Sequence, residues 1–151
     1  MKKIFLIIVL FSSALLADKI ILLNKHEIDP VYRVPVKQSR FLCEAKLTDG
    51  KVVQFISAQS MLLVFNDQEH YIKAGFLSSK IKNIYVQGYM SGDKINAKNA
   101  LYVYGSGLAL SNGGDLVACK NMKYAKLFEK KHGGRKIMKF SDITLRLLRY
   151  L

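Results

Sequence analysis

Cysteine and histidine are scarce in this 151-residue chain, and their spacing excludes the commonest structural metal site. Cys43 and Cys119 are the only cysteines, and no two cysteine or histidine residues stand within a few positions of each other, as a zinc site requires. The Gly-x-Ser-x-Gly elbow of serine hydrolases is absent, and no Ser–His–Asp or Cys–His arrangement can be assembled. We therefore predict that the protein is not an enzyme.

Long apolar runs are missing everywhere except near the N-terminus. Two lysines precede an unbroken apolar run at residues 4–11, and the small residue Ala17 follows. This order predicts a cleaved signal peptide over residues 1–17. The run is shorter than the roughly 20 residues of a membrane span, although an uncleaved anchor is the alternative. No cysteine stands at the cleavage point, so we expect a periplasmic protein that is not a lipoprotein.

Acidic residues are also few, at 11 against 24 lysines and arginines, which gives a net charge of +13, or +11 without the two lysines of the signal peptide (13 − 2). A basic surface attracts nucleic acid, anionic lipid or acidic proteins, and export argues against nucleic acid. A solvated surface with no specific anionic ligand is the alternative. The candidate partner surface is one face of a predicted helix, formed by Lys123, Lys126, Lys130 and Lys131.

The two cysteines leave three interpretations open. In an oxidising compartment Cys43 and Cys119 can form a disulfide. They can instead be two buried thiols, or take part in metal or redox chemistry. The mature chain of about 134 residues (151 − 17) is one domain long enough to fold without a bridge or a metal.

Turn and periodicity signals divide the first half of the mature chain. Residues 18–40 contain both prolines and are expected to form an extended arm, followed by a domain over residues 41–151. The Asp49-Gly50 pair predicts a tight hairpin that places Cys43 opposite Ile56. The expected strand, return strand, helix and strand cover residues 41–47, 52–56, 58–67 and 81–89.

The second half repeats this plan. The expected strand, turn, return strand, helix and strand cover residues 100–104, 111–114, 116–119, 122–131 and 136–140, and Ser141 opens a short C-terminal helix. A shift of 63 positions lays Gly50 on Gly113 and Phe65 on Phe128. We therefore predict an α+β fold of two β-β-α-β repeats.

A series of short motifs runs in a fixed order along residues 41–144. The motifs are Asp49-Gly50-Lys51, Met61, Ile84-Tyr85-Val86, Ala97-Lys98-Asn99-Ala100, Gly105-Ser106, Ala125-Lys126-Leu127-Phe128, His132-Gly133-Gly134 and Phe140-Ser141-Asp142-Ile143. In this order and spacing they resemble the NosL family, the accessory proteins of nitrous oxide reductase. The resemblance implies two repeats of the β-β-α-β unit, as in the related organomercurial lyase fold, and Cu(I) as cargo outside the cytoplasm.

The departures from the family pattern concern its sulfur ligands. The family usually carries a Cys-x-x-Cys-Gly-Met segment before the first hairpin, where residues 31–41 here contain no cysteine, methionine or glycine. It also tends to place Pro-Met-Gly in the loop before the second return strand, where Asn112 here takes the place of the methionine. Soft sulfur ligands suit Cu(I), so any copper site in this chain has to use other residues.

Cys43 and Met90 are the candidate metal ligands. Cys43 lies a few residues beyond the usual ligand segment, and its alternative is a buried strand thiol or half of a bridge. Met90 lies at a predicted turn, whereas Met61 lies on the inner face of a helix and is expected to fill core space. His132 is expected to complement the C-terminus of its helix.

These observations favour two functions. The first is an exported NosL-like accessory protein for Cu(I) trafficking or for maturation of a periplasmic metalloenzyme, with that enzyme or a membrane-bound maturation protein as partner. The second is a metal-free paralogue that keeps the scaffold and binds a partner.

Overall fold

The computed structural model describes residues 20–108 and 115–151. The predicted signal peptide, the predicted turn at 111–114 and Asn112 lie outside the described residues. Within the described ranges, no helix is long and apolar enough to cross a membrane.

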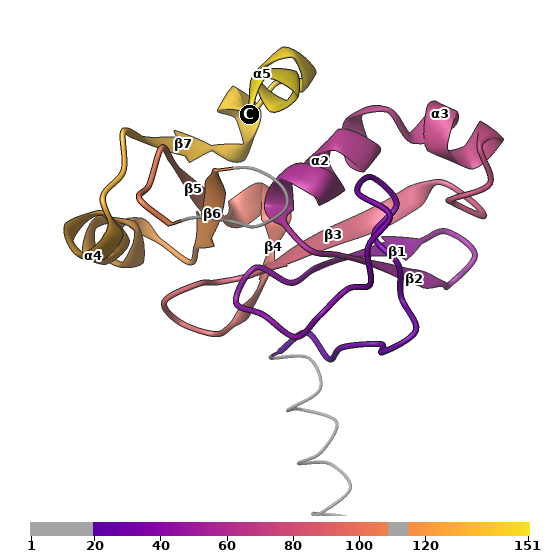
Figure 1. The fold of residues 1–151 in the computed structure, drawn as a ribbon, viewed down its shortest axis with the longest axis horizontal. Coiled ribbons are helices and arrows are strands. Elements are labelled where there is room, and N and C mark those ends of the chain that lie inside the picture. The colour runs from indigo at the N-terminus through magenta and orange to yellow at the C-terminus, as the bar shows by residue number, and fades with distance from the viewer. Residues whose placement is uncertain (1–19, 109–114) are drawn as a thin grey trace, which may run out of the picture.

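Two antiparallel sheets form the framework (Figure 1). The first sheet has the order β2-β1-β3-β4 and the second the order β6-β5-β7. The seven strands are β1 (Cys43–Leu47), β2 (Val52–Phe55), β3 (Ile81–Gln87), β4 (Lys94–Asn96), β5 (Leu101–Tyr104), β6 (Leu116–Cys119) and β7 (Lys136–Lys139). The helices are α2 (Ala58–Asn66), α3 (Gln68–Lys73), α4 (Met122–His132) and α5 (Leu145–Tyr150), with short 3₁₀ turns η1 (Ala97–Asn99) and η2 (Phe140–Asp142).

The topology confirms the predicted duplication. In each half the first strand is central, and the return strand and the strand after the helix pair with it on opposite sides, as β2-β1-β3 and as β6-β5-β7. The first half has two additions, the helix α3 and the edge strand β4. The fold is therefore α+β, with two β-β-α-β units and a short C-terminal helix.

The hairpin between β1 and β2 forms where predicted, but its register differs by one residue. Cys43 pairs with Phe55, not with Ile56. The Leu47 N–H donates to the Lys51 carbonyl at 2.8 Å and the Gly50 N–H donates to the Leu47 carbonyl at 3.1 Å, which closes a three-residue loop instead of a two-residue turn. Gly50 adopts φ of +88°, a left-handed conformation that glycine accepts without steric cost.

Helix α2 begins as its sequence predicts. The Ser57 hydroxyl accepts a hydrogen bond from the Ser60 N–H at 3.1 Å, and the following apolar residues turn one face into the core. The helix ends at Asn66, and α3 follows directly where a loop was expected. Because α3 has no buried residue, no apolar periodicity marked it in the sequence.

Helix α4 and the C-terminal helix also have side-chain caps. The Asn121 side chain accepts a hydrogen bond from the Tyr124 N–H at 3.2 Å, and Gly133, at φ of +76°, ends α4. The prediction that Ser141 opens the last helix was wrong. Ser141 lies inside η2, and Thr144 caps α5 by accepting from the Leu147 N–H at 3.2 Å.

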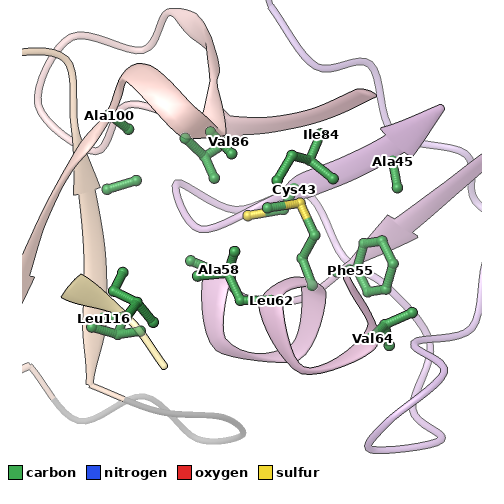
Figure 2. Packing of buried hydrophobic residues seen from close by; sticks show 14 of the residues in the cluster. Cys43, Ala45, Phe55, Ala58, Leu62, Val64, Ile84, Val86, Ala100 and Leu116 are labelled. Atoms are coloured by element: carbon green, nitrogen blue, oxygen red, sulfur yellow. The ribbon is translucent and has the colours of Figure 1, made fainter. Parts of the chain in front are cut away.

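The main core is shared by both halves of the chain. Helix α2 covers one face of the first sheet, and its residues Ala58 and Leu62 lie between Cys43 of β1 and Leu116 of β6 (Figure 2). Tyr102 of β5 is fully buried in the same cluster, and its hydroxyl donates to the Ala97 carbonyl at 2.7 Å. A packed interior that mixes residues of both units makes them one structural body.

The segment before β1 has little regular structure, as expected, yet it packs closely on the domain. Ile21, Val36 and Leu42 form a small buried cluster with Ile56 and Tyr85. The same segment contains a fully buried carboxylate, that of Asp29. It accepts hydrogen bonds from the N–H groups of Val31, Tyr32 and Ile56 and from the Ser60 hydroxyl.

Candidate functional site

Cys43 is the first residue of β1 and is only 1% exposed. Its Sγ donates to the Phe41 carbonyl at 3.2 Å, and it lies beside Ile84, Val86 and Ala58 in the main core (Figure 2). Burial is the largest influence on this thiol and raises its pKa far above the ordinary value. A metal ligand must be the thiolate, so binding through Cys43 requires loss of this proton and an opening of the core around it.

Cys119 is the last residue of β6 and is also fully buried, but in a second apolar cluster with Val103, Val117 and Phe128. Burial, with a smaller contribution from the Glu129 carboxylate, raises the pKa of its thiol to about 11. Both cysteines are free thiols in the structure, and they belong to different clusters. The structure does not bring the predicted disulfide partners together, and their pairing stays a prediction.

Met90 lies in the loop after β3 and is half-buried. It packs against the cluster that contains Cys119, together with Phe41 and Tyr124. The loop is held on both sides, because the Tyr89 N–H donates to the Ala118 carbonyl of β6 at 2.9 Å and the Gly92 N–H donates to the Gly88 carbonyl at 2.8 Å. The Met90 thioether is thus held near the place where β3 approaches the second sheet.

Four aromatic rings meet beside Met90, and we call them the aromatic corner: Phe41, Tyr89, Phe128 and His132. The Tyr89 ring is central, with centroid distances of 5.3 Å to Phe41, 5.2 Å to Phe128 and 5.6 Å to His132. The Arg40 guanidinium lies 5.4 Å from the centroid of Tyr89. The corner therefore joins the segment before β1, the Met90 loop and the end of α4.

His132 carries the one side-chain nitrogen of the described residues that is buried without a hydrogen-bond partner, its Nε2. Sequence reasoning gave His132 only a capping role, and it did not predict contact with Tyr89, 43 positions earlier (132 − 89). The position of His132 before Gly133-Gly134 predicts the end of a helix, but it does not predict which loop packs against that end. The imidazole packs against Phe128, a member of the cluster against which Met90 also packs, and both the imidazole and the thioether suit a soft metal.

No group of three histidine, cysteine or acidic side chains within the described ranges could hold a metal ion together. The two candidate ligands also lie in different clusters, Cys43 in the main core and Met90 against the second cluster. A site with three or more protein ligands among the described residues would therefore need a residue of another type, such as methionine.

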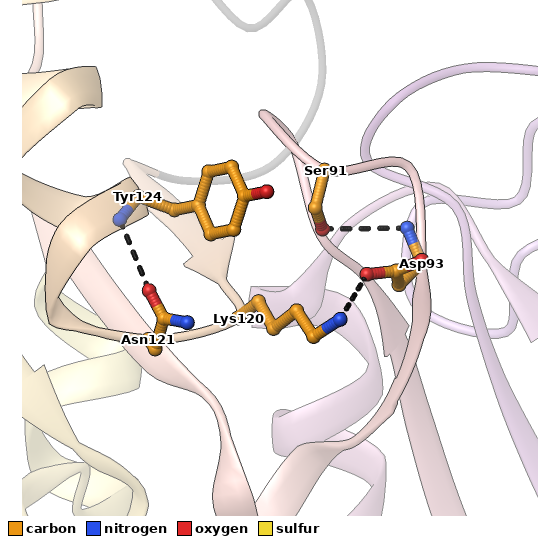
Figure 3. A network of polar contacts seen from close by, with 5 residues as sticks. All are labelled: Ser91, Asp93, Lys120, Asn121 and Tyr124. Atoms are coloured by element: carbon orange, nitrogen blue, oxygen red, sulfur yellow. Dashed lines mark hydrogen bonds and ion pairs between the residues drawn. The ribbon is translucent and has the colours of Figure 1, made fainter.

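The four predicted surface lysines are all exposed on α4. At the start of this helix, the Lys120 ammonium pairs with the Asp93 carboxylate at 2.6 Å (Figure 3). Within the same loop, the backbone N–H of Asp93 donates a hydrogen bond to the Ser91 hydroxyl at 3.4 Å. These contacts attach the N-terminal end of α4 to the loop that carries Met90.

The fold and the packing of its interior define the structural class of the protein. It is an α+β domain in which two β-β-α-β units share one core. The NosL family model matches residues 31–148, and the chain belongs to this family. The match begins inside the segment that was predicted to form an extended arm.

A solved structure shares the fold. It is the crystal structure of the copper chaperone NosL from Shewanella denitrificans, with a TM-score of 0.66 and 20% sequence identity over 85% of this chain and 98% of that chain. A comparison with curated proteins finds no match.

Proposed function

We propose that this chain is an exported NosL-like accessory protein that handles Cu(I) as cargo during maturation of a metalloenzyme outside the cytoplasm. The observation that carries the proposal is the match of the NosL family model over residues 31–148. NosL is an accessory family related to copper chaperones, and the solved structure with the same fold bears that name. The order of charged, apolar and small residues at positions 1–17 supports export.

Met90 is the more accessible of the two proposed sulfur ligands, because it is half-buried in a loop while Cys43 lies within a strand in the core. Thioether sulfur binds Cu(I) without losing a proton, so Met90 carries no protonation cost. Cys43 does carry one, since its thiol is neutral at ordinary pH. We propose Met90 as the first ligand and Cys43 as a second ligand that becomes available when the core opens.

Anaerobic competition for Cu(I) against bicinchoninate tests this assignment. We expect the reduced protein to take Cu(I) from the indicator and Met90→Leu to weaken binding at least about tenfold. Met122→Leu is the matched control, because Met122 is a 47% exposed methionine on α4, and this variant should bind as the parent does. Equal affinities for the parent and for Met90→Leu would remove Met90 from the site.

The pH dependence separates the two sulfur ligands. If the Cys43 thiolate binds, each Cu(I) displaces a proton and the affinity rises about tenfold per pH unit below the thiol pKa. Binding through Met90 alone has no such slope. Cys43→Ser should abolish the slope and Cys119→Ser should preserve it.

The metal-free alternative has its own support in the absence of a three-residue ligand group from the described ranges. It predicts that the bicinchoninate complex keeps all its Cu(I) when the protein is added in excess. In that case the scaffold serves partner binding alone.

A further inference from the structure

The outward side of α4 presents a continuous set of cations with two exposed apolar side chains among them. Helical spacing of 100° per residue places three lysines, Lys126, Lys130 and Lys123, between Met122 and Leu127, with Lys131 beyond Leu127. Met122 is 47% and Leu127 45% exposed, and the lysines are exposed as well. We call this surface the α4 lysine face: Met122, Lys123, Lys126, Leu127, Lys130 and Lys131.

The spacing of these lysines does not favour the first part of the helix. Lys126 lies three positions after Lys123 and four before Lys130, spacings at which like charges repel. Lys123 stands in the first turn, where a cation opposes the helix dipole and where α4 has no acidic residue, whereas Lys130 and Lys131 lie in the last turn, where cations are favourable. The ion pairs found among the described residues use Lys94 and Lys120, so none of these four ammonium groups belongs to one of them.

The composition of the face favours a lipid surface over a protein surface. Protein interfaces are depleted in lysine at their centres, whereas Lys-rich helices with apolar neighbours lie at the surface of anionic bilayers. The face is also the convex outer side of a helix.

We propose that the α4 lysine face binds reversibly to an anionic phospholipid surface. The lysine ammonium groups contact lipid phosphates, and Met122 and Leu127 enter the interfacial region between headgroups. The opposite side of α4 stays packed in the domain through Ala125 and Phe128. This inference does not depend on copper, because none of the six residues is a proposed ligand.

Cosedimentation with vesicles tests the proposal. Binding to vesicles of phosphatidylcholine and phosphatidylglycerol in a 70:30 ratio is compared with binding to vesicles of pure phosphatidylcholine. The protein is used in the form that the producing cells make after any processing. The readout is the ratio of the two partition coefficients. We expect anionic vesicles to bind the parent at least about tenfold better, since each lysine contributes roughly a fivefold factor near such a surface. The ratio should fall toward one in high salt.

Lys123→Glu combined with Lys126→Glu should lower that ratio at least about tenfold without unfolding the protein. The variant replaces the first-turn cation at position 123 by an acid and creates a favourable Glu–Lys pair at positions 126 and 130. Positions 123 and 126 stay like-charged, as in the parent, so the helix should be at least as stable as the parent helix. The matched control is Lys51→Glu combined with Lys80→Glu, which changes the net charge equally. These two exposed lysines lie near the β1–β2 turn, at the opposite end of the molecule from α4 (Figure 1).

Three outcomes would overturn the proposal. They are equal binding to the two kinds of vesicle, an equal loss of binding in the control variant, and binding to poly-L-glutamate with no preference for anionic vesicles. The last outcome would assign the face to an acidic protein. Cu(I) competition by the Lys123→Glu, Lys126→Glu variant should match that of the parent, so failure here is distinguishable from failure of the copper role.

Discussion

The two cysteines show how burial sets the chemistry of a single side chain. Both thiols are almost inaccessible, and removal from water raises the pKa of each because the thiolate loses more hydration than the thiol. Neither sulfur is a ready nucleophile or ligand while the domain is closed. Any metal or redox role of Cys43 or Cys119 therefore requires local opening.

Burial of Cys119 predicts a loss of stability in alkaline solution. Above pH of about 9 the unfolded chain loses the thiol proton, whereas the folded chain keeps it until pH of about 11. The unfolded state then binds fewer protons, so the free energy of unfolding falls as the pH rises through this window. At about 1.4 kcal/mol per pKa unit, the contribution of Cys119 is about 2–3 kcal/mol.

Urea unfolding of the reduced protein at pH 8 and pH 11 measures this loss. Cys119→Ala should lose about 2–3 kcal/mol less than the parent over that interval. Cys43→Ala, which leaves Cys119 in place, should retain the Cys119 contribution. An identical loss in the parent and in Cys119→Ala would show that this thiol does not titrate as stated.

At the scale of elements, a buried ion pair ties together two strands that are not neighbours. Glu44 of β1 and Lys94 of β4 pair across β3, and their side chains are only 7% and 9% exposed. The Lys94 ammonium also lies 4.6 Å from the centroid of the Tyr85 ring of β3. Beyond backbone pairing with β3, the short edge strand β4 is therefore held by this charged contact and by Ile95, which packs against the main core.

Lys94→Met should destabilise the protein by about 3 kcal/mol or more, because the Glu44 carboxylate then stays buried without its partner. Lys94→Met combined with Glu44→Gln should recover part of that loss. The control is Lys120→Met, which breaks the exposed pair with Asp93 and should cost less than about 1 kcal/mol. Urea unfolding measures all three variants, and equal losses in Lys94→Met and Lys120→Met would contradict the argument.

The elements that sequence reasoning found are those with strong local signals. Ser57 and Asn121 cap helices whose apolar residues recur at helical spacing, and Asp49-Gly50 marks a hairpin, so all three positions were predicted. Strand β4 has only three residues and is defined by its pairing with β3, which no local pattern reveals. Helix α3 has no buried residue, so hydrophobic periodicity does not reveal it.

The candidate site was harder to predict than the fold, because it depends on contacts between distant segments. The position of Cys43 at the start of β1 follows from local pattern, but its complete burial follows from α2 and β6 closing over it. Likewise, nothing local to Tyr89-Met90 or to His132 indicates that the Tyr89 and His132 rings pack together or that Met90 packs against the cluster of Cys119. The resemblance to the family led to the proposed copper role. Because this chain departs from the family pattern at the usual sulfur ligands, the sequence did not identify which residues would bind the metal.

At the scale of the whole molecule, the shared core predicts one unfolding transition. Tyr102 and Leu116 of the second unit are buried in the same cluster as Phe55 and Met61 of the first, so neither unit can open without exposing the other. Thermal transitions followed by far-ultraviolet and near-ultraviolet circular dichroism should coincide. Two separated transitions would show that the units unfold independently.

The repeated β-β-α-β unit also bears on how such a fold could arise. One unit alone would expose to water the apolar side that now faces its counterpart, and two separate copies could hide it only by dimerising. Such a dimer would come apart on dilution. In this chain, residues 97–100 connect the units covalently, so their association is intramolecular and insensitive to dilution. A protein built this way stays folded at copy numbers at which a pair of free subunits would have separated.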